Sequence, residues 1–130
     1  MAKSRRSIEV PGLSHGAAPI PLAARVGNVI YSSAISGREP GTGKLPATGA
    51  EQVALAFAHM QAILKAGGGT LESVVKLSIA LADNSTREAV NEEWLKCFPD
   101  PDDRPARHIT LHELANGLLA QLEFVAVITE

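Results

Sequence analysis

The chain has 130 residues, of which 45% are hydrophobic and 20% are charged, and its formal net charge is −2. This composition is typical of one globular domain, predicted over residues 1–130, and excludes a largely disordered chain. The low charge and the 4% of aromatic residues argue against nucleic-acid partners, and no apolar run is long enough for a membrane span. The lone Cys97 cannot form an internal disulfide, so a reducing, cytoplasmic location is expected.

The first quarter of the chain predicts three extended segments. Residues 8–10 alternate between apolar and polar and end at a Pro-Gly pair, which indicates a short edge strand. Residues 22–26 and 28–35 are expected to pair as a hairpin around Gly27 and Asn28, because both of these residues tolerate positive φ.

A long helix is predicted over residues 48–66, after a glycine-rich loop. Thr48 and Glu51 have the spacing of a capping box, and apolar residues recur every three or four positions behind them. His59 lies off this apolar stripe and is interpreted as a surface histidine. The three glycines at 67–69 are expected to end the helix with a left-handed cap.

The next segments predict a strand and a second helix. Residues 73–82 are almost all apolar, which suits a central strand that is covered on both faces. Ser85 and Glu88 form a second possible capping box, and the helix behind them is expected to end near Phe98. Trp94 is interpreted as a core anchor of this helix.

The chain ends in two further predicted strands, residues 106–114 and 118–129, with Asn116 and Gly117 between them. An Asn-Gly pair between two such runs is a strong signal for a hairpin. The order β-β-β-α-β-α-β-β predicts a two-layer α+β domain, with two helices on one face of a mixed sheet.

The other face of this sheet has no covering element in the chain. Its expected apolar residues are Ile109, Leu111, Val125 and Val127. A whole sheet face of this kind is unfavourable in water, so we expect self-association to cover it.

Arg107 is the first candidate for ligand binding. It stands at the start of a strand, behind the acidic and proline-rich loop 99–103. Its planar guanidinium can donate two parallel hydrogen bonds to a carboxylate. The alternative is a surface arginine that pairs with Asp102 or Asp103.

Gln121 and Glu123 are the second candidates. They alternate in the last strand, so both leave the same face of the sheet, and that strand is expected to be the hairpin partner of the one with Arg107. They form either a structural hydrogen-bond pair at an interface or the polar wall of a pocket.

Two other motifs carry no site. His108 and His112 have the spacing of a helical zinc site, but in a strand the two rings would be roughly 13 Å apart, so no metal site is expected. The Gly-Thr-Gly-Lys run at 41–44 has the wrong glycine spacing for a phosphate loop.

Several stretches, in this order and spacing, resemble the RidA/YjgF family of reactive-intermediate deaminases over about residues 8–129. They are 27–33 (GNVIYSS), 41–45 (GTGKL), 66–68 (AGG), 73–76 (SVVK), 89–92 (AVNE), 105–107 (PAR) and 121–127 (QLEFVAV). The resemblance implies a chorismate-mutase-like α+β fold and a homotrimer with clefts between its subunits. It also implies hydrolysis of enamines and imines derived from amino acids, with release of ammonia and without metal or organic cofactor.

The resemblance also implies site residues. The carboxylate-binding arginine of the family falls on Arg107, a site serine on Ser33 and a site asparagine on Asn91. Ile109 takes the place of a family cysteine, and Gln121 takes the place of the glutamate that handles the catalytic water.

A further departure is Ile20, which stands near the place of the family's early site tyrosine. Because an amide cannot exchange protons as a carboxylate does, the acid/base half of the site is altered. The expected function is a deaminase acting on a small carboxylate-bearing enamine or imine. A non-catalytic carboxylate-binding protein is the alternative, and a ribonuclease or translation inhibitor is disfavoured by charge and aromatic content.

Overall fold

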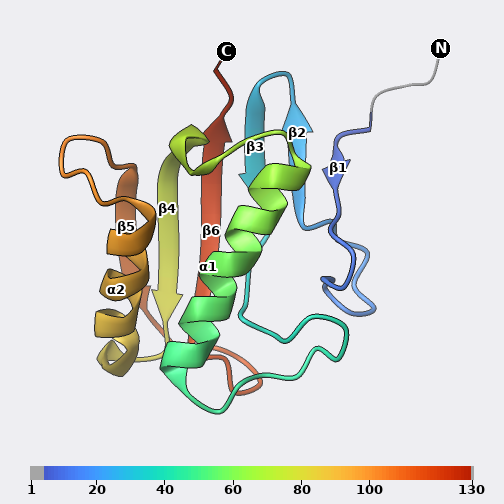
Figure 1. Ribbon diagram of the computed structural model, residues 1–130. Helices are drawn as coiled ribbons and strands as arrows, with labels where there is room; N and C mark the ends of the chain where they lie inside the picture. Colours follow the sequence, from blue (N-terminus) through green and yellow to red (C-terminus); the bar gives the residue numbers. More distant parts are fainter. Residues whose placement is uncertain (1–4, 130) are drawn as a thin grey trace.

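The computed structural model describes residues 5–129, in which two α-helices pack on one face of a six-stranded mixed sheet (Figure 1). The elements are β1 Ser7–Ile8, β2 Ala23–Val26, β3 Val29–Ser32, α1 Gly49–Ala66, β4 Val74–Leu81, α2 Arg87–Cys97, β5 Ala106–Leu111 and β6 Ala120–Val127. Short 3-10 turns precede β4 and α2. The predicted element order and the two-layer α+β architecture are confirmed.

The strands lie side by side in the order β1-β2-β3-β6-β4-β5, as Figure 1 shows. The predicted β2–β3 hairpin forms around Gly27, which has a φ of 60°. β4 and β5 are parallel and are joined through α2, while β6 pairs antiparallel with both β3 and β4. β5 is therefore an edge strand of the sheet.

The predicted hairpin between the last two strands is wrong. Asn116 and Gly117 do make a tight turn, with φ values of 58° and 81°. However, β6 enters the sheet between β3 and β4, so β4 separates it from β5. The turn sets the direction of the chain, but β6 gains two strand partners in the centre of the sheet instead of one at the edge.

Helix α1 begins and ends as predicted. The Thr48 side chain accepts a hydrogen bond from the backbone N–H of Glu51 at 3.2 Å, and Gly68 adopts a φ of 87° beyond the last turn. His59, however, is not a surface side chain, since only 7% of it is exposed. Its Nε2 lies 2.6 Å from the carbonyl oxygen of Arg38, so the loop before α1 folds over this histidine.

The start of α2 differs from the prediction. Asp83 accepts a hydrogen bond from the backbone N–H of Ser85 at 2.7 Å, and the 3-10 turn that it caps leads into α2 at Arg87. Ser85 therefore does not form the expected capping box with Glu88. An aspartate can bond the backbone two residues ahead of it, and here that local turn replaces the expected helix start.

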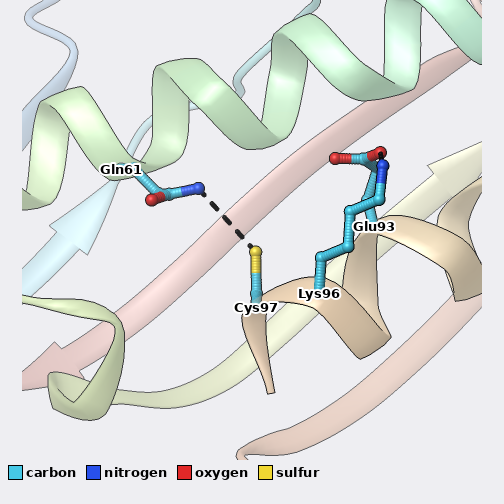
Figure 2. A network of polar contacts seen from close by, with 4 residues as sticks. All are labelled: Gln61, Glu93, Lys96 and Cys97. Atoms are coloured by element: carbon cyan, nitrogen blue, oxygen red, sulfur yellow. Dashed lines mark hydrogen bonds and ion pairs between the residues drawn. The ribbon is translucent and has the colours of Figure 1, made fainter. Parts of the chain in front are cut away.

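The two helices also contact each other through polar side chains, which Figure 2 shows together with an ion pair on α2. Gln61 on α1 donates to Sγ of Cys97 at 3.8 Å, and Lys96 pairs with Glu93 at 3.0 Å. Burial, with Glu93 as a smaller cause, raises the pKa of the Cys97 thiol, which is therefore a weak nucleophile at neutral pH.

Alternate residues of the central strands face the helices and form the core. In β6 the even-numbered residues are buried, and they pack with Leu77, Ile79 and Leu81 of β4. The odd-numbered side chains of β6 leave the opposite face, which no helix within residues 5–129 covers (Figure 1). β4 is thus covered on one face only, in contrast to the prediction, and Val75 on it is 49% exposed.

Two of the residues predicted on the uncovered face lie on the other side of the sheet. Ile109 and Leu111 pair in register with buried residues of β4, so they lie on the helix side of the sheet. The prediction is correct for Val125 and Val127, and the apolar side chains of the uncovered face are completed by Val26, Val29 and Tyr31. Tyr31 is 62% exposed. No helix within residues 5–129 is long and apolar enough to cross a membrane.

Candidate functional site

Arg107 lies at the start of β5 and points to the side of the sheet that α2 occupies. Its Nη1 donates to Oδ1 of Asn91 on α2 at 2.9 Å. The centre of its guanidinium lies 5.0 Å from the centroid of the Trp94 ring, a distance at which a cation is attracted to the ring face. The structure therefore brings together two predicted site residues, Arg107 and Asn91, and holds the arginine between an amide and an aromatic ring.

Within residues 5–129, the charge of Arg107 has no acidic partner. The one ion pair among residues 5–129 is between Lys96 and Glu93, so the proposed pairing of Arg107 with Asp102 or Asp103 does not form. Burial lowers the pKa of Arg107, and the positive charge of Arg87 adds to this effect. Its two remaining nitrogens have no hydrogen-bond partner in the described chain, which leaves donors free for an anion.

Trp94 has two roles in this arrangement. It is 9% exposed, as expected for a core anchor, and its ring packs on Phe98 with 4.8 Å between the centroids. Its position on α2, one helical turn after Asn91, also places it under Arg107. The spacing of three residues between Asn91 and Trp94 is the sequence signal for this arrangement, because residues three or four apart lie on the same face of a helix.

Gln121 belongs to a different part of the molecule. It lines a cavity of about 610 Å³ between residues 12–16, the loop after β3 and α1. His15 and His59 line the same cavity. Gln121 is thus part of the wall of a partly open cavity, in agreement with the interpretation of this residue as part of a pocket wall.

Ser33 and Glu123 lie outside the residues that line this cavity. Ser33 donates its hydroxyl to the carbonyl oxygen of Pro21 at 2.8 Å, just before the cavity wall at Ala34. Glu123 is exposed on the uncovered face of the sheet, in register with Ser78 of β4. The face shared by Gln121 and Glu123 is confirmed, but only Gln121 reaches the cavity.

The two halves of the predicted site do not meet within one chain. Arg107 pairs with Leu77 of β4, whereas Gln121 pairs with Ala80 of β4 from its other side. These registers put the two Cα atoms roughly 14 Å apart, and the side chains leave opposite faces of the sheet. Ile109 lies on the Arg107 side, half-buried against the core.

His15 is a cavity residue that the sequence did not single out. Its Nε2 lies 2.8 Å from the carbonyl oxygen of Ala34, so this nitrogen must carry the proton. Its Nδ1, which is a hydrogen-bond acceptor in a neutral imidazole, is buried and has no partner among residues 5–129. No sequence pattern marks this histidine, because the contact joins two loops.

Gln52 is a second residue that the sequence did not single out. It is 1% exposed, and its side chain bonds Pro46 at 3.0 Å, Gly117 at 3.3 Å and the N–H of Leu119 at 2.9 Å. These contacts fix the chain just before β6 and thereby position Gln121. No three or more His, Cys, Asp or Glu side chains in the part of the chain described could together hold a metal ion.

Comparison with known proteins gives the family. A family model described as Endoribonuclease L-PSP matches residues 17–128, which is most of the chain. The chain belongs to the RidA/YjgF family. It is 37% identical over 112 residues to Reactive Intermediate Deaminase A, chloroplastic, of Arabidopsis thaliana, a match that covers 85% of this chain and 58% of that protein. The chain thus spans less than two thirds of that relative.

Other RidA relatives match over nearly their whole length. The human 2-iminobutanoate/2-iminopropanoate deaminase is 33% identical over 125 residues, which are 95% of this chain and 90% of the human protein. The structure of RidA from an Antarctic Psychrobacter superposes with a TM-score of 0.86 at 29% identity, covering 95% of this chain and all of that one. The RidA fold, a chorismate-mutase-like α+β fold, is therefore confirmed for this chain.

Proposed function

We propose that this RidA-family chain is a deaminase that hydrolyses a small enamine or imine bearing a carboxylate, with release of ammonia. The names of its relatives support the reaction class, because they include reactive-intermediate and 2-imino-acid deaminases at 33–37% identity. The observation that carries the proposal in the structure is Arg107, a half-buried cation with free donors and no acidic partner among residues 5–129. Such a group binds a carboxylate through paired, charge-assisted hydrogen bonds.

In the proposed reaction, Arg107 holds the substrate carboxylate and Asn91 keeps the guanidinium in place. The oxygen of a water molecule bonds to the imine carbon, the carbon–nitrogen bond breaks, and the nitrogen leaves as ammonia while a keto acid remains. Gln121 can orient the water by hydrogen bonds but cannot take its proton. We propose that Glu123 takes the proton of the water only when the substrate is longer or differently placed. We also propose that Ser33 and Ile109 line the substrate-binding site. The proposal involves no metal or organic cofactor.

We further propose that the working form is a homotrimer with its clefts between subunits. The apolar side chains on the uncovered sheet face support this, as does the separation of Arg107 from Gln121 within one chain. Sedimentation of the purified chain in dilute buffer is expected to give a mass of about three chains, because burial of this face stabilises the assembly. A clean monomer would contradict both the interface and the shared cleft.

Turnover of imines distinguishes an enzyme from a non-catalytic binding protein of the same fold. The presence of Gln121 in place of a carboxylate favours that non-catalytic alternative. Imines are generated in place by an amino-acid oxidase, and ammonia and keto-acid release are followed with and without the chain. We expect accelerated release from at least one imine of a panel, together with weak activity on those of alanine and serine. Binding of keto acids without acceleration of any imine would favour the non-catalytic alternative. The cytoplasmic location stays a prediction.

A further inference from the structure

Arg87, the first residue of α2, lies about one helical turn before Asn91, which holds the guanidinium of Arg107. Arg87 and Asn91 are four residues apart in the helix, so they are neighbours on its surface, with about 5–6 Å between their Cβ atoms. Oδ1 of Asn91 accepts the hydrogen bond from Arg107 on β5 at 2.9 Å. The guanidinium of Arg107 therefore ends about one helical turn from the residue that carries the second guanidinium.

The charge of Arg87 is also left without an acidic partner among residues 5–129. Its Nε donates to the amide oxygen of Asn84 at 3.0 Å, an uncharged partner, and no other hydrogen bond of its side chain occurs within the described residues. Asp83, four residues before it, accepts a hydrogen bond from the backbone of Ser85 and forms no ion pair with Arg87. Val90 and Asn91, three and four residues after it, are uncharged. By contrast, Lys96 on the same helix is neutralised by Glu93 at a distance of 3.0 Å.

The charge of Arg87 acts on Arg107. After burial, the positive charge of Arg87 is the second cause that lowers the pKa of Arg107, and no carboxylate within residues 5–129 offsets it. Two like charges at a partly buried place destabilise the fold, and a bound ligand with two negative charges removes that cost. A ligand with one carboxylate neutralises only one of the two arginines.

We propose that Arg87 is a specificity residue, which binds a second carboxylate when the first is held by Arg107. The substrate class is then a four- or five-carbon dicarboxylic imine, derived from an acidic amino acid. This inference rests on the proposed function, since it assumes that Arg107 binds the first carboxylate. It narrows the substrate from a small carboxylate to a dicarboxylate.

The test compares two keto acids, the product-like ligands 2-oxoglutarate and 2-oxobutanoate, by calorimetry. The unmodified chain is expected to bind 2-oxoglutarate about 10- to 100-fold more tightly, as for one additional charged hydrogen-bonded contact. Arg87→Gln is expected to abolish this preference and to change the affinity for 2-oxobutanoate less than about 2-fold. Arg87→Lys, which keeps the charge, should retain part of the preference.

The matched control is Lys96→Gln, which removes the same charge from the same helix at a position already paired with Glu93. It is expected to leave both affinities unchanged, and thermal melting checks that every variant is folded. If the unmodified chain binds both keto acids equally, or if Arg87→Gln weakens both equally, the inference is wrong, although Arg107-dependent binding would still support the proposed function. If neither ligand depends on Arg107, the proposed function fails as well.

Discussion

Replacing Arg107 by lysine is expected to weaken the binding of small keto acids by roughly 10- to 150-fold. Lysine keeps the positive charge but loses the paired contact, and each charge-assisted hydrogen bond lost costs about 1.5–3 kcal/mol. In this chain the change also removes the hydrogen bond to Asn91 and the planar group that lies over Trp94. The lysine ammonium would be held less rigidly than the guanidinium, so the loss of affinity reflects poorer orientation of the cation as well as fewer hydrogen bonds.

Calorimetry with 2-oxobutanoate measures this effect, and ammonia release from the corresponding imine provides a second readout. The matched control is Arg6→Lys, an exposed arginine next to β1, at the opposite end of the sheet from β5. It should bind as the unmodified chain does. Equal affinity of Arg107→Lys and the unmodified chain would remove Arg107 from the site.

Gln121→Glu is the second change with a large expected effect, a rise of about 10²- to 10⁴-fold in hydrolysis of short imines. A carboxylate can accept a proton from the attacking water and deliver one to the departing nitrogen, whereas the amide can only orient the water. The structure gives position 121 the necessary access, because it lines the 610 Å³ cavity.

The measurement is ammonia release from the imine of alanine, generated in place by an amino-acid oxidase. Glu123→Gln is the matched control, since it removes a carboxylate from the same strand face but lies outside the cavity residues. It is expected to change the rate on short imines little. Should the unmodified chain already hydrolyse these imines as fast as Gln121→Glu, or lose that activity in Glu123→Gln, the role given to position 121 would be wrong.

Local patterns predicted the elements well and their pairing less well. The Thr48 cap, the Gly68 ending and the β2–β3 turn depend on neighbouring residues, so their signals are present in short stretches of sequence. The Asn116–Gly117 turn was also predicted correctly, yet the strands on either side of it do not pair. A tight turn specifies the chain direction over a few residues, whereas strand neighbours depend on contacts across the whole sheet.

The sequence predicted some neighbours in the candidate site and missed others. The family resemblance and the chemistry of a free guanidinium indicated Arg107 and Asn91 together, and the structure joins them at 2.9 Å. Neither signal indicated that Gln121 would line a cavity together with His15 and His59, apart from Arg107. That placement follows from the insertion of β6 between β3 and β4.

The sequence by itself determined the order of the elements, the two helices on one face of the sheet, the family and the alternation of Gln121 with Glu123. These features depend on residue periodicity, local turn chemistry and motif spacing, all of which can be read from the order of the residues. Tertiary structure alone decided which strands are neighbours, which residues line the cavity and that Arg87 stands beside the Arg107 site. Such features join residues far apart in sequence, and their energies depend on packing that no local stretch contains.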